Sequence, residues 1–420
     1  MPPQSMTVAN KTESPELSGG TRSVARQPIL DLQGRIYGYE LLYRVGTETE
    51  FRADGELASR TILDDTVIFG VESYTGGALA FINCTSETLT GDLVSVLPTN
   101  LTVLEILETV EPLPDLIAAC GKLKSLGFKL ALDDFVWSPE FAPLVDLADY
   151  IKVDFKLSSS QKRRELIKRL KGIGIQFLAE KVETLAEYEQ ARAEGFTLFQ
   201  GYYFCRPELL KSRKVPSNRL CHFEILRLLH TDPVDLLKLS RTMKRDQSLT
   251  YRLLRLVNSA AYGMRAEVTS VRSALMVLGE DTFRRVAMLA ILTELNSGGP
   301  QEVLRMAMVR ARFCELASEL CGFSYTEQYL LGMLSLLPAM LSIPMEELTP
   351  SLPLREEIKA ALEGTINREG CMLAWLRANE VGDWAACESI VRSNGLKQQQ
   401  VNRCYIEAIL WAESQFLLAE

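Results

Sequence analysis

A pair of adjacent carboxylates ends one of the apolar runs in the first half of the sequence. In KLALDDF, residues 129–135, the β-forming residues stop at Asp133 and Asp134. An apolar strand does not need a charged pair at its end, so we interpret the two acids as directed at a ligand. Other apolar runs in this half also end in side chains that carry a charge or an amide. These are Glu40, Asn83, Glu105, Lys152, Glu180 and Gln200.

This set of side chains favours a hard divalent cation, because carboxylate and amide oxygens without a thiolate suit Mg²⁺ or Mn²⁺. The pair Asp133–Asp134 could serve two cations, with one acid bridging them. Two metals about 4 Å apart suit the hydrolysis of a phosphodiester. Lys152 would orient the attacking water or neutralise developing charge, and Arg44, four residues after Glu40, would hold a phosphate. A salt bridge between Lys152 and Glu180 is the alternative.

Strand-like runs alternate with helix-like segments up to about residue 205. Such alternation predicts parallel strands joined by crossover helices, and eight runs predict a (β/α)8 barrel. Chemistry in these barrels lies at the C-terminal ends of the strands, which is where the polar residues fall. The runs are 23–30, 35–43, 78–84, 101–107, 128–134, 150–155, 176–182 and 198–204.

The first two runs are joined only by DLQG, residues 31–34. This connection is too short for a parallel crossover, so the barrel should open with an antiparallel hairpin. The connections at 84–100 and 135–149 are also short, which predicts small outer helices there.

From about residue 213 the apolar residues recur at the spacing of amphipathic helices, as in SLTYRLLRLVNSA, residues 248–260. This half is therefore predicted to be all-α. The segment PELLKSRKVPSNR, residues 207–219, holds two prolines and is the predicted joint. The predicted division is a disordered tail at 1–21, a barrel domain at 22–207 and a helical domain at 208–420.

Composition narrows the class of protein. The net charge of −8 argues against direct nucleic-acid binding, and the absence of a run of 18 apolar residues argues against a membrane span. The nine cysteines form no C-x-x-C pair and there are two histidines, which indicates reduced core thiols and not a zinc site. These features indicate a cytoplasmic protein.

Several strings resemble, in order, the motifs of EAL domains, which are phosphodiesterases of cyclic di-GMP. YELLYR, residues 39–44, is similar to the E-x-L-x-R signature of that family. The strings RQPILD, FINCTS, VLEILE, LALDDF, IKVDF, LAEKVET and FQGYYFCRP match its other motifs. The resemblance covers about residues 23–207.

The resemblance implies a role for each matching residue. The metal ligands would be Glu40, Asn83, Glu105, Asp133 and Asp134, with Lys152 and Glu180 around the attacking water. Gln27, Arg44 and Gln200 would contact the nucleotide, and Glu108 would steady the loop that follows DDF.

Two positions depart from the EAL pattern. Active EAL enzymes continue DDF with a Gly-Thr-Gly-Tyr-Ser-Ser type of sequence, whereas this chain has VWSPEF, residues 136–141. In the family this loop couples nucleotide and dimer contacts to the metals, so the change predicts weak or lost turnover with the ligands intact. Lys181 stands where glycine is usual, and a lysine there would compete with a metal for the carboxylates.

The helical half resembles the HDOD domain through RDQSLTYRLLRLVNSAAYG, residues 245–263, and SVRSALMVLG, residues 270–279. Related HD phosphohydrolases bind metal with a His-Asp doublet. The corresponding stretch here is GMLSLL, residues 332–337, so the doublet is absent. The resemblance implies an EAL–HDOD signalling protein whose helical half binds a protein partner without catalysis.

Three functions remain open at this point. The preferred one is a barrel that binds cyclic di-GMP or a divalent metal with weak or lost hydrolysis, while the helical domain passes the state to a protein partner. The second is an active Mg²⁺- or Mn²⁺-dependent phosphodiesterase that opens cyclic di-GMP to linear pGpG. The third is a structural scaffold in which the acids pair with Lys152 and Lys181. A homodimer is compatible with each.

Overall fold

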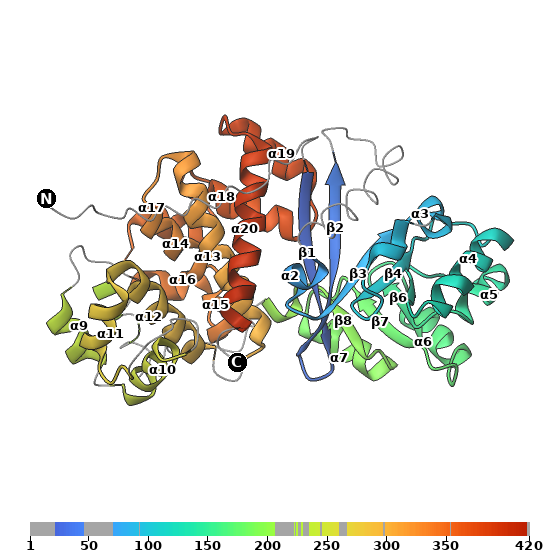
Figure 1. The fold of residues 1–420 in the computed structure, drawn as a ribbon, viewed down its shortest axis with the longest axis horizontal. Helices are drawn as coiled ribbons and strands as arrows, with labels where there is room; N and C mark the ends of the chain where they lie inside the picture. The colour runs from blue at the N-terminus through green and yellow to red at the C-terminus, as the bar shows by residue number, and fades with distance from the viewer. Residues whose placement is uncertain are drawn as a thin grey trace, which may run out of the picture.

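The computed structural model is a closed barrel that lies beside a helical domain (Figure 1). It describes residues 22–45, 70–91, 93–205, 222, 224–225, 228–229, 235–243, 246–259, 267–296, 299–352 and 354–417. The predicted tail at 1–21 and the predicted joint at 207–219 lie outside these residues, so the domain boundaries stay predictions.

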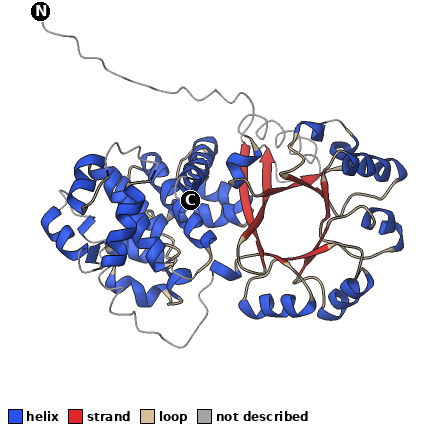
Figure 2. Cartoon of the chain, turned by 60° about the horizontal axis from the view of Figure 1, so that its bottom comes forward, coloured by secondary structure: helices blue, strands red, loops and turns tan. Residues whose placement is uncertain are grey.

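The barrel closes through eight strands in sequence order, and Figure 2 looks into the ring that they form. β1 is antiparallel to β2 and to β8, and the other neighbours are parallel. Both the barrel and its antiparallel opening hairpin are therefore confirmed. The strands are β1 Arg22–Asp31, β2 Ile36–Val45, β3 Leu79–Cys84, β4 Thr102–Ile106, β5 Lys129–Leu132, β6 Tyr150–Asp154, β7 Gln176–Glu180 and β8 Leu198–Gln200.

The helices outside the barrel are short where the connections are short, as predicted. The connection after β3 holds a helix of 5 residues, α3, and the connection after β5 holds one of 4 residues, α5. Two longer helices begin at side chains that cap them: Ser159 caps α6, and Thr184 and Glu187 form the capping box of α7. The helices are α2 Val71–Thr75, α3 Ser86–Thr90, α4 Pro114–Ser125, α5 Ala142–Val145, α6 Ser160–Arg169 and α7 Leu185–Glu194.

Apolar side chains fill one end of the barrel interior, and the polar ones follow directly above them. The filling consists of Ile29, Phe81, Val103, Ala131, Tyr150, Leu178 and Leu198. Residues two apart on a strand point to the same side. The next inward layer, two residues after six of these, is therefore Asn83, Glu105, Asp133, Lys152, Glu180 and Gln200. This alternation is what assembles the predicted site.

The helical domain packs around two long helices, α13 and α20, which contact each other and lie next to the barrel (Figure 1). In its core Phe313 stacks on Trp375 with ring centroids 5.0 Å apart, and Tyr405 meets both rings edge-on. The helices are α9 Leu236–Met243, α10 Gln247–Val257, α11 Val271–Leu278, α12 Glu280–Leu295, α13 Gln301–Cys321, α14 Tyr325–Leu334, α15 Leu337–Leu341, α16 Met345–Leu348, α17 Glu356–Leu362, α18 Cys371–Glu380, α19 Trp384–Ser393 and α20 Gln398–Leu417.

The two domains meet along the β1–β2 hairpin, where α18 and α20 pack on β1. Arg26 extends from β1 into the helical domain, and its Nη1 donates to Glu413 Oε1 at 2.6 Å and to the Tyr74 carbonyl at 2.7 Å. The side chains of Arg26 and Glu413 are both buried. Two charges buried together in this way fix the relative position of the domains, because neither tolerates loss of the other.

Further polar contacts extend this interface on both sides of Arg26. The hydroxyl of Tyr39 on β2 donates to Glu302 Oε2 at 2.8 Å. Asn379 Nδ2 donates to the Val24 carbonyl at 3.2 Å, and Asn402 Nδ2 donates to Ser23 Oγ at 2.9 Å. β1 is therefore bonded to α18 and α20, and its neighbour β2 is bonded to α13.

The buried carboxyl of Glu302 should make stability depend on pH. Burial raises its pKa to about 7, although Arg26, Arg305 and the Tyr39 hydroxyl lower it, while Glu413 raises it further. Because the pKa of Glu302 is higher in the folded than in the unfolded protein, its protonation stabilises the fold at low pH. This contribution to stability is lost as pH rises through about 7. Glu302→Gln should therefore gain stability relative to wild type between pH 5 and pH 8, by at most about 3 kcal/mol.

Urea unfolding of both proteins at the two pH values measures this difference. Because Gln keeps an oxygen that accepts from Tyr39, the comparison isolates the charge. A variant whose stability runs parallel to wild type across this range would show that Glu302 does not titrate there.

Candidate active site at the barrel mouth

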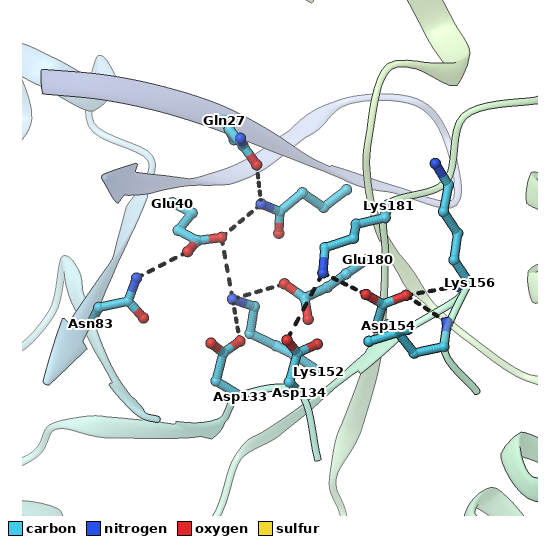
Figure 3. A network of polar contacts seen from close by, with 12 residues as sticks. Gln27, Glu40, Asn83, Asp133, Asp134, Lys152, Asp154, Lys156, Glu180 and Lys181 are labelled. Carbon is cyan, nitrogen blue, oxygen red and sulfur yellow. Dashed lines mark hydrogen bonds and ion pairs between the residues drawn. The ribbon is translucent and has the colours of Figure 1, made fainter. Parts of the chain in front are cut away.

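The polar side chains at the strand ends converge on the ammonium group of Lys152 (Figure 3). Its Nζ lies 2.7 Å from Asp133 Oδ1, 2.8 Å from Glu105 Oε1, 3.0 Å from Glu180 Oε1 and 3.2 Å from Glu40 Oε2. Lys152 is fully buried, at 0% exposure. The sequence-based alternative of a Lys152–Glu180 salt bridge is thus present, but as one of four contacts.

Glu40 is held by two amides in addition to Lys152. Asn83 Nδ2 donates to Glu40 Oε1 at 3.1 Å, and Gln200 Nε2 donates to Glu40 Oε2 at 2.7 Å. Gly38 allows β2 to approach β3 here, since a Cβ at this position would lie 2.7 Å from the Leu79 carbonyl oxygen. The geometry brings together predicted ligands from β2, β3, β4 and the end of β5.

The second acid of the pair, Asp134, has a different neighbour from Asp133. Its φ of 40° is left-handed, and Lys181 Nζ lies 3.9 Å from its Oδ2. Lys181 itself pairs closely with Asp154, whose pKa is lowered by hydrogen bonds from Lys181 and the backbone of Leu157 and Lys156, against the effect of burial. The predicted competition by Lys181 is therefore directed at Asp134 and Asp154, not at the central ring.

Burial and mutual repulsion make several of these acids hard to ionise. Burial, with the charges of Glu40 and Asp133, raises the pKa of Glu105 well above its ordinary value despite Lys152. The same causes raise the pKa of Glu180 to about 8. Burial alone would lower the pKa of Lys152, but the surrounding carboxylates hold it well above its usual range. The ammonium is therefore charged, and the acids outnumber it.

Several buried oxygens of this ring have no hydrogen-bond partner within the described residues. Lys152 has three protons for four carboxylates, and Glu105 and Asp133 lie within ion-pair distance of it without hydrogen-bond geometry. The oxygens are Asn83 Oδ1, Glu105 Oε1 and Oε2, Asp133 Oδ1, Asp134 Oδ1, Glu180 Oε2 and Gln200 Oε1. Buried oxygens of this kind are normally satisfied.

Unsatisfied hard oxygens and excess negative charge fit divalent cations. Five carboxyl groups, those of Glu40, Glu105, Asp133, Asp134 and Glu180, face the ammonium groups of Lys152 and Lys181. In the arrangement described, no three acid, histidine or cysteine side chains are already grouped for a metal ion. Lys152 lies between the acids, so cation binding requires its ammonium to shift.

A cavity of about 560 Å³ opens beside this ring. Its wall carries acids and bases together with Trp137, the acids being Asp134, Asp154 and Glu165 and the bases being Lys162 and Arg169 of α6. Glu108 is exposed and also lines the cavity. Its predicted role in steadying the loop stays a prediction.

Two family models match the chain in the predicted order, one for the EAL domain at residues 86–207 and one for the HDOD domain at 215–341. The chain is 35% identical over 400 residues to the cyclic di-GMP phosphodiesterase CdgJ of Vibrio cholerae, covering 94% of this chain and 93% of that protein. It is 32% identical over 402 residues to the uncharacterized protein YuxH of Bacillus subtilis, covering 93% and 98%. The chain belongs to the EAL–HDOD family.

Solved EAL structures align with part of this EAL–HDOD protein. BlrP1 of Klebsiella pneumoniae, solved with calcium and cyclic di-GMP, aligns with a TM-score of 0.39 and 26% identity over 46% of this chain and 58% of that one. An EAL domain protein of Listeria monocytogenes aligns with a TM-score of 0.35 and 22% identity over 48% and 91%. In the part of the chain that the structure describes, no helix is long and apolar enough to cross a membrane.

Aromatic side chains hold the loop at residues 136–141, whose sequence VWSPEF departs from the usual EAL pattern. Phe135 meets Trp137 and Phe141 edge-on, with centroids 6.5 and 5.9 Å apart. The guanidinium of Arg169 lies 4.9 Å from the centroid of Trp137. The loop is therefore packed on α6 where the usual EAL sequence supplies glycines and small hydroxyls.

One predicted residue of the EAL site cannot be placed by its side chain, and one further residue was not predicted. The side chain of Arg44, predicted to hold a phosphate, lies outside the described residues, although its backbone belongs to β2. Asp154 was not predicted as part of the site. It follows Lys152 by two residues on β6, so the same alternation that identified Lys152 could have found it. Its Oδ1 accepts from the backbone of Lys156 and Leu157, at 2.7 and 2.9 Å, which shapes the turn after β6.

Lys181→Gly should strengthen metal binding at little cost in stability. Lys181 has a φ of 55°, a left-handed conformation that glycine adopts without strain. The change removes an ion pair between the half-exposed Lys181 and the buried Asp154, which keeps its two backbone hydrogen bonds, and it frees Asp134 from a competing ammonium. We expect tighter Mn²⁺ binding by calorimetry and a melting temperature close to wild type. Equal or weaker Mn²⁺ affinity would show that Lys181 does not compete.

Proposed function

We propose that this EAL–HDOD protein is a divalent-metal-dependent cyclic di-GMP phosphodiesterase, with the barrel mouth as its active site and linear pGpG as its product. The observation that carries the proposal is the ring of buried acids around Lys152, with more unsatisfied oxygens than one ammonium can satisfy. The name of the Vibrio cholerae relative, which aligns along nearly the whole chain, supports the same activity.

In this proposal Glu40, Asn83, Glu105, Asp133 and Asp134 hold Mg²⁺ or Mn²⁺, because they present carboxylate and amide oxygens alone. Divalent cations bound there supply Lewis-acid catalysis to the phosphodiester bond. Once cations balance the acids, Lys152 no longer has to neutralise four carboxylates and its ammonium can orient the attacking water. Glu180, whose Oε1 lies 3.0 Å from Lys152 Nζ, would accept the proton of that water in its ionised form.

The nucleotide would occupy the mouth and extend into the neighbouring cavity of about 560 Å³. Gln200 and Gln27 present amide groups at the mouth, and Arg44 lies on the adjacent strand. Trp137 offers an aromatic face for a guanine base, and Lys162 and Arg169 would contact phosphate, whereas the acids Glu108, Asp134, Asp154 and Glu165 line the same cavity. The helical domain would then pass the bound state to a protein partner.

Nucleotide binding with weak or no turnover is the second candidate, and a specific observation favours it. Lys152 lies where cations would have to bind, and the packed VWSPEF loop replaces the glycine-rich sequence of active EAL enzymes. In this case the barrel is a receptor for the nucleotide, and the helical domain passes the bound or free state of the barrel to a protein partner.

Calorimetric titration of the full chain with cyclic di-GMP, with and without Mn²⁺, followed by chromatography of the nucleotide, tests the proposal. We expect Mn²⁺-dependent conversion to pGpG that Asp133→Asn abolishes. Binding without conversion would establish the receptor function. If the protein neither binds nor converts cyclic di-GMP, the structural scaffold remains, in which the acids pair only with Lys152 and Lys181.

A further inference from the structure

We propose that the helical domain positions Glu40 through a relay of hydrogen bonds that enters the barrel at Gln27. This inference rests on the proposed function, since Glu40 belongs to the same ring of acids. It makes Gln27 a positioning residue, in addition to its predicted contact with the nucleotide. It also gives the end of α18 a defined part in the barrel site.

On the barrel side, the relay uses both amide protons of Gln200. Its Nε2 donates to Glu40 Oε2 at 2.7 Å and to Gln27 Oε1 at 2.8 Å. An amide with both protons engaged is fixed in orientation. Gln27 Nε2 in turn donates to the carbonyl oxygen of Glu380 at 3.3 Å. Two side chains, those of Gln200 and Gln27, therefore connect a ring carboxylate to the backbone of the helical domain.

On the helical side, the last residue of α18 is held by a buried ion pair. Arg310 of α13 donates from Nε and Nη2 to the two carboxylate oxygens of Glu380, at 2.8 and 2.6 Å. Both side chains are buried, and a two-pronged pair of this type fixes angle as well as distance. Asn379, the preceding residue, donates to the Val24 carbonyl at 3.2 Å. The last turn of α18 is therefore fixed both to α13 and to β1.

The relay begins at the segment 332–337, where related phosphohydrolases carry their His-Asp doublet. Arg310 Nη1 donates to Ser335 Oγ at 3.0 Å. Gly332 packs so closely on α13 that a Cβ there would lie 2.2 Å from the Arg310 carbonyl oxygen. A partner that changes how α13 and α14 pack would move Arg310, and with it the end of α18.

The consequence at the barrel follows from the order of the bonds. If the carbonyl of Glu380 withdraws, Gln27 is free to turn, and Gln200 loses one of its two acceptors. Glu40 then keeps its contacts with Asn83 and Lys152, but its third partner, Gln200, is no longer fixed in orientation. Residues that orient metal ligands typically change affinity by about 10–100-fold when they are removed. The helical domain would thus set the cation affinity of the barrel without touching a cation.

The test is the double variant Arg310→Met/Glu380→Leu in the full chain. Both partners are replaced because removing one would leave a buried charge unpaired, whereas apolar substitutes of similar size keep such sites folded. The matched control is Arg312→Met, two residues further along α13, whose acid partners Glu315 and Glu407 are outside the relay. Circular dichroism confirms that each variant is folded.

Two measurements separate the relay from the proposed function. In the metal-free proteins, hydrogen exchange should become faster in the peptides that contain Gln27 and Gln200 in the double variant but not in the control. In calorimetry, the double variant should bind Mn²⁺ about tenfold more weakly than wild type and the control equally well. Cyclic di-GMP hydrolysis, where measured, should recover at high Mn²⁺.

Unchanged exchange in both peptides would overturn the relay whether or not the protein binds metal. Faster exchange with unchanged Mn²⁺ affinity would overturn the positioning role of Gln27. If wild type binds no Mn²⁺ but the double variant still exchanges faster, the relay would be supported as a structural connection. The proposed metal-dependent function would then be the part that is wrong.

Discussion

We expect Asp133→Asn to abolish Mn²⁺ binding and to leave the metal-free fold at least as stable as wild type. Asp133 Oδ1 lies 2.7 Å from Lys152 Nζ, in a ring where acids outnumber the ammonium groups. Removing one carboxylate reduces the repulsion among the others. The same change removes an oxygen ligand, and because outer groups alone cost about 10–100-fold in affinity, loss of a ligand should exceed this.

Calorimetry with Mn²⁺ and thermal unfolding without metal measure the two parts of this result. Asp115→Asn is the matched control, because Asp115 is an exposed acid in the first turn of α4. It should leave Mn²⁺ affinity unchanged and cost no more than about 1 kcal/mol of stability. Undiminished Mn²⁺ binding by Asp133→Asn would remove Asp133 from the ligand set, and a large loss of metal-free stability would show that its pairing with Lys152 is structural.

Lys152→Met should destabilise the metal-free protein at pH 8 by about 3–5 kcal/mol, because it leaves the surrounding acids without their buried counter-charge. The loss should shrink as pH falls. Burial raises the pKa of Glu105 and of Glu180 above their unfolded values, whereas the charge of Lys152 lowers both. Removing Lys152 should therefore raise both pKa values further. Acids with raised pKa values bind protons in the folded state, so stability declines as pH rises through about 8.

Urea unfolding at pH 6 and pH 8, each with and without Mn²⁺, checks this expectation. Bound Mn²⁺ should restore stability to Lys152→Met at pH 8, since it replaces the missing positive charge. Lys124→Met serves as the control, because Lys124 pairs with Asp149 in a partly exposed site and its loss should cost less than about 1 kcal/mol. If Lys152→Met is as stable as Lys124→Met at pH 8, the acids around Lys152 are already neutral at that pH.

The ring could be predicted from sequence because it depends on local alternation. Glu105, Lys152 and Glu180 each follow an apolar inward residue by two positions, and that spacing fixes their direction once the strands pair. The hairpin was equally predictable, since DLQG is too short for anything else. Motif order then placed the residues of the barrel in one family.

The position of the ammonium within the ring could not be predicted in the same way. Which acids Lys152 contacts depends on side-chain packing across the barrel, and these partners are far apart in sequence, as with Glu40 at a separation of 112 residues. The contact of Arg26 with Glu413, 387 residues away, is likewise invisible to local pattern. Lys181 is unusual in the sequence because glycine is expected there, but nothing in the sequence identifies Asp154 as its partner.

The burial of Arg26 against Glu413 also bears on how such proteins evolve. Many signalling proteins arise when genes recombine and a sensor acquires a new output module. Here, an exchanged module would leave Arg26 and the hydroxyl of Tyr39 facing foreign or absent groups on an otherwise dry surface. The two halves of this chain should therefore be inherited together, and hybrids made by swapping one half should require compensating changes along the hairpin.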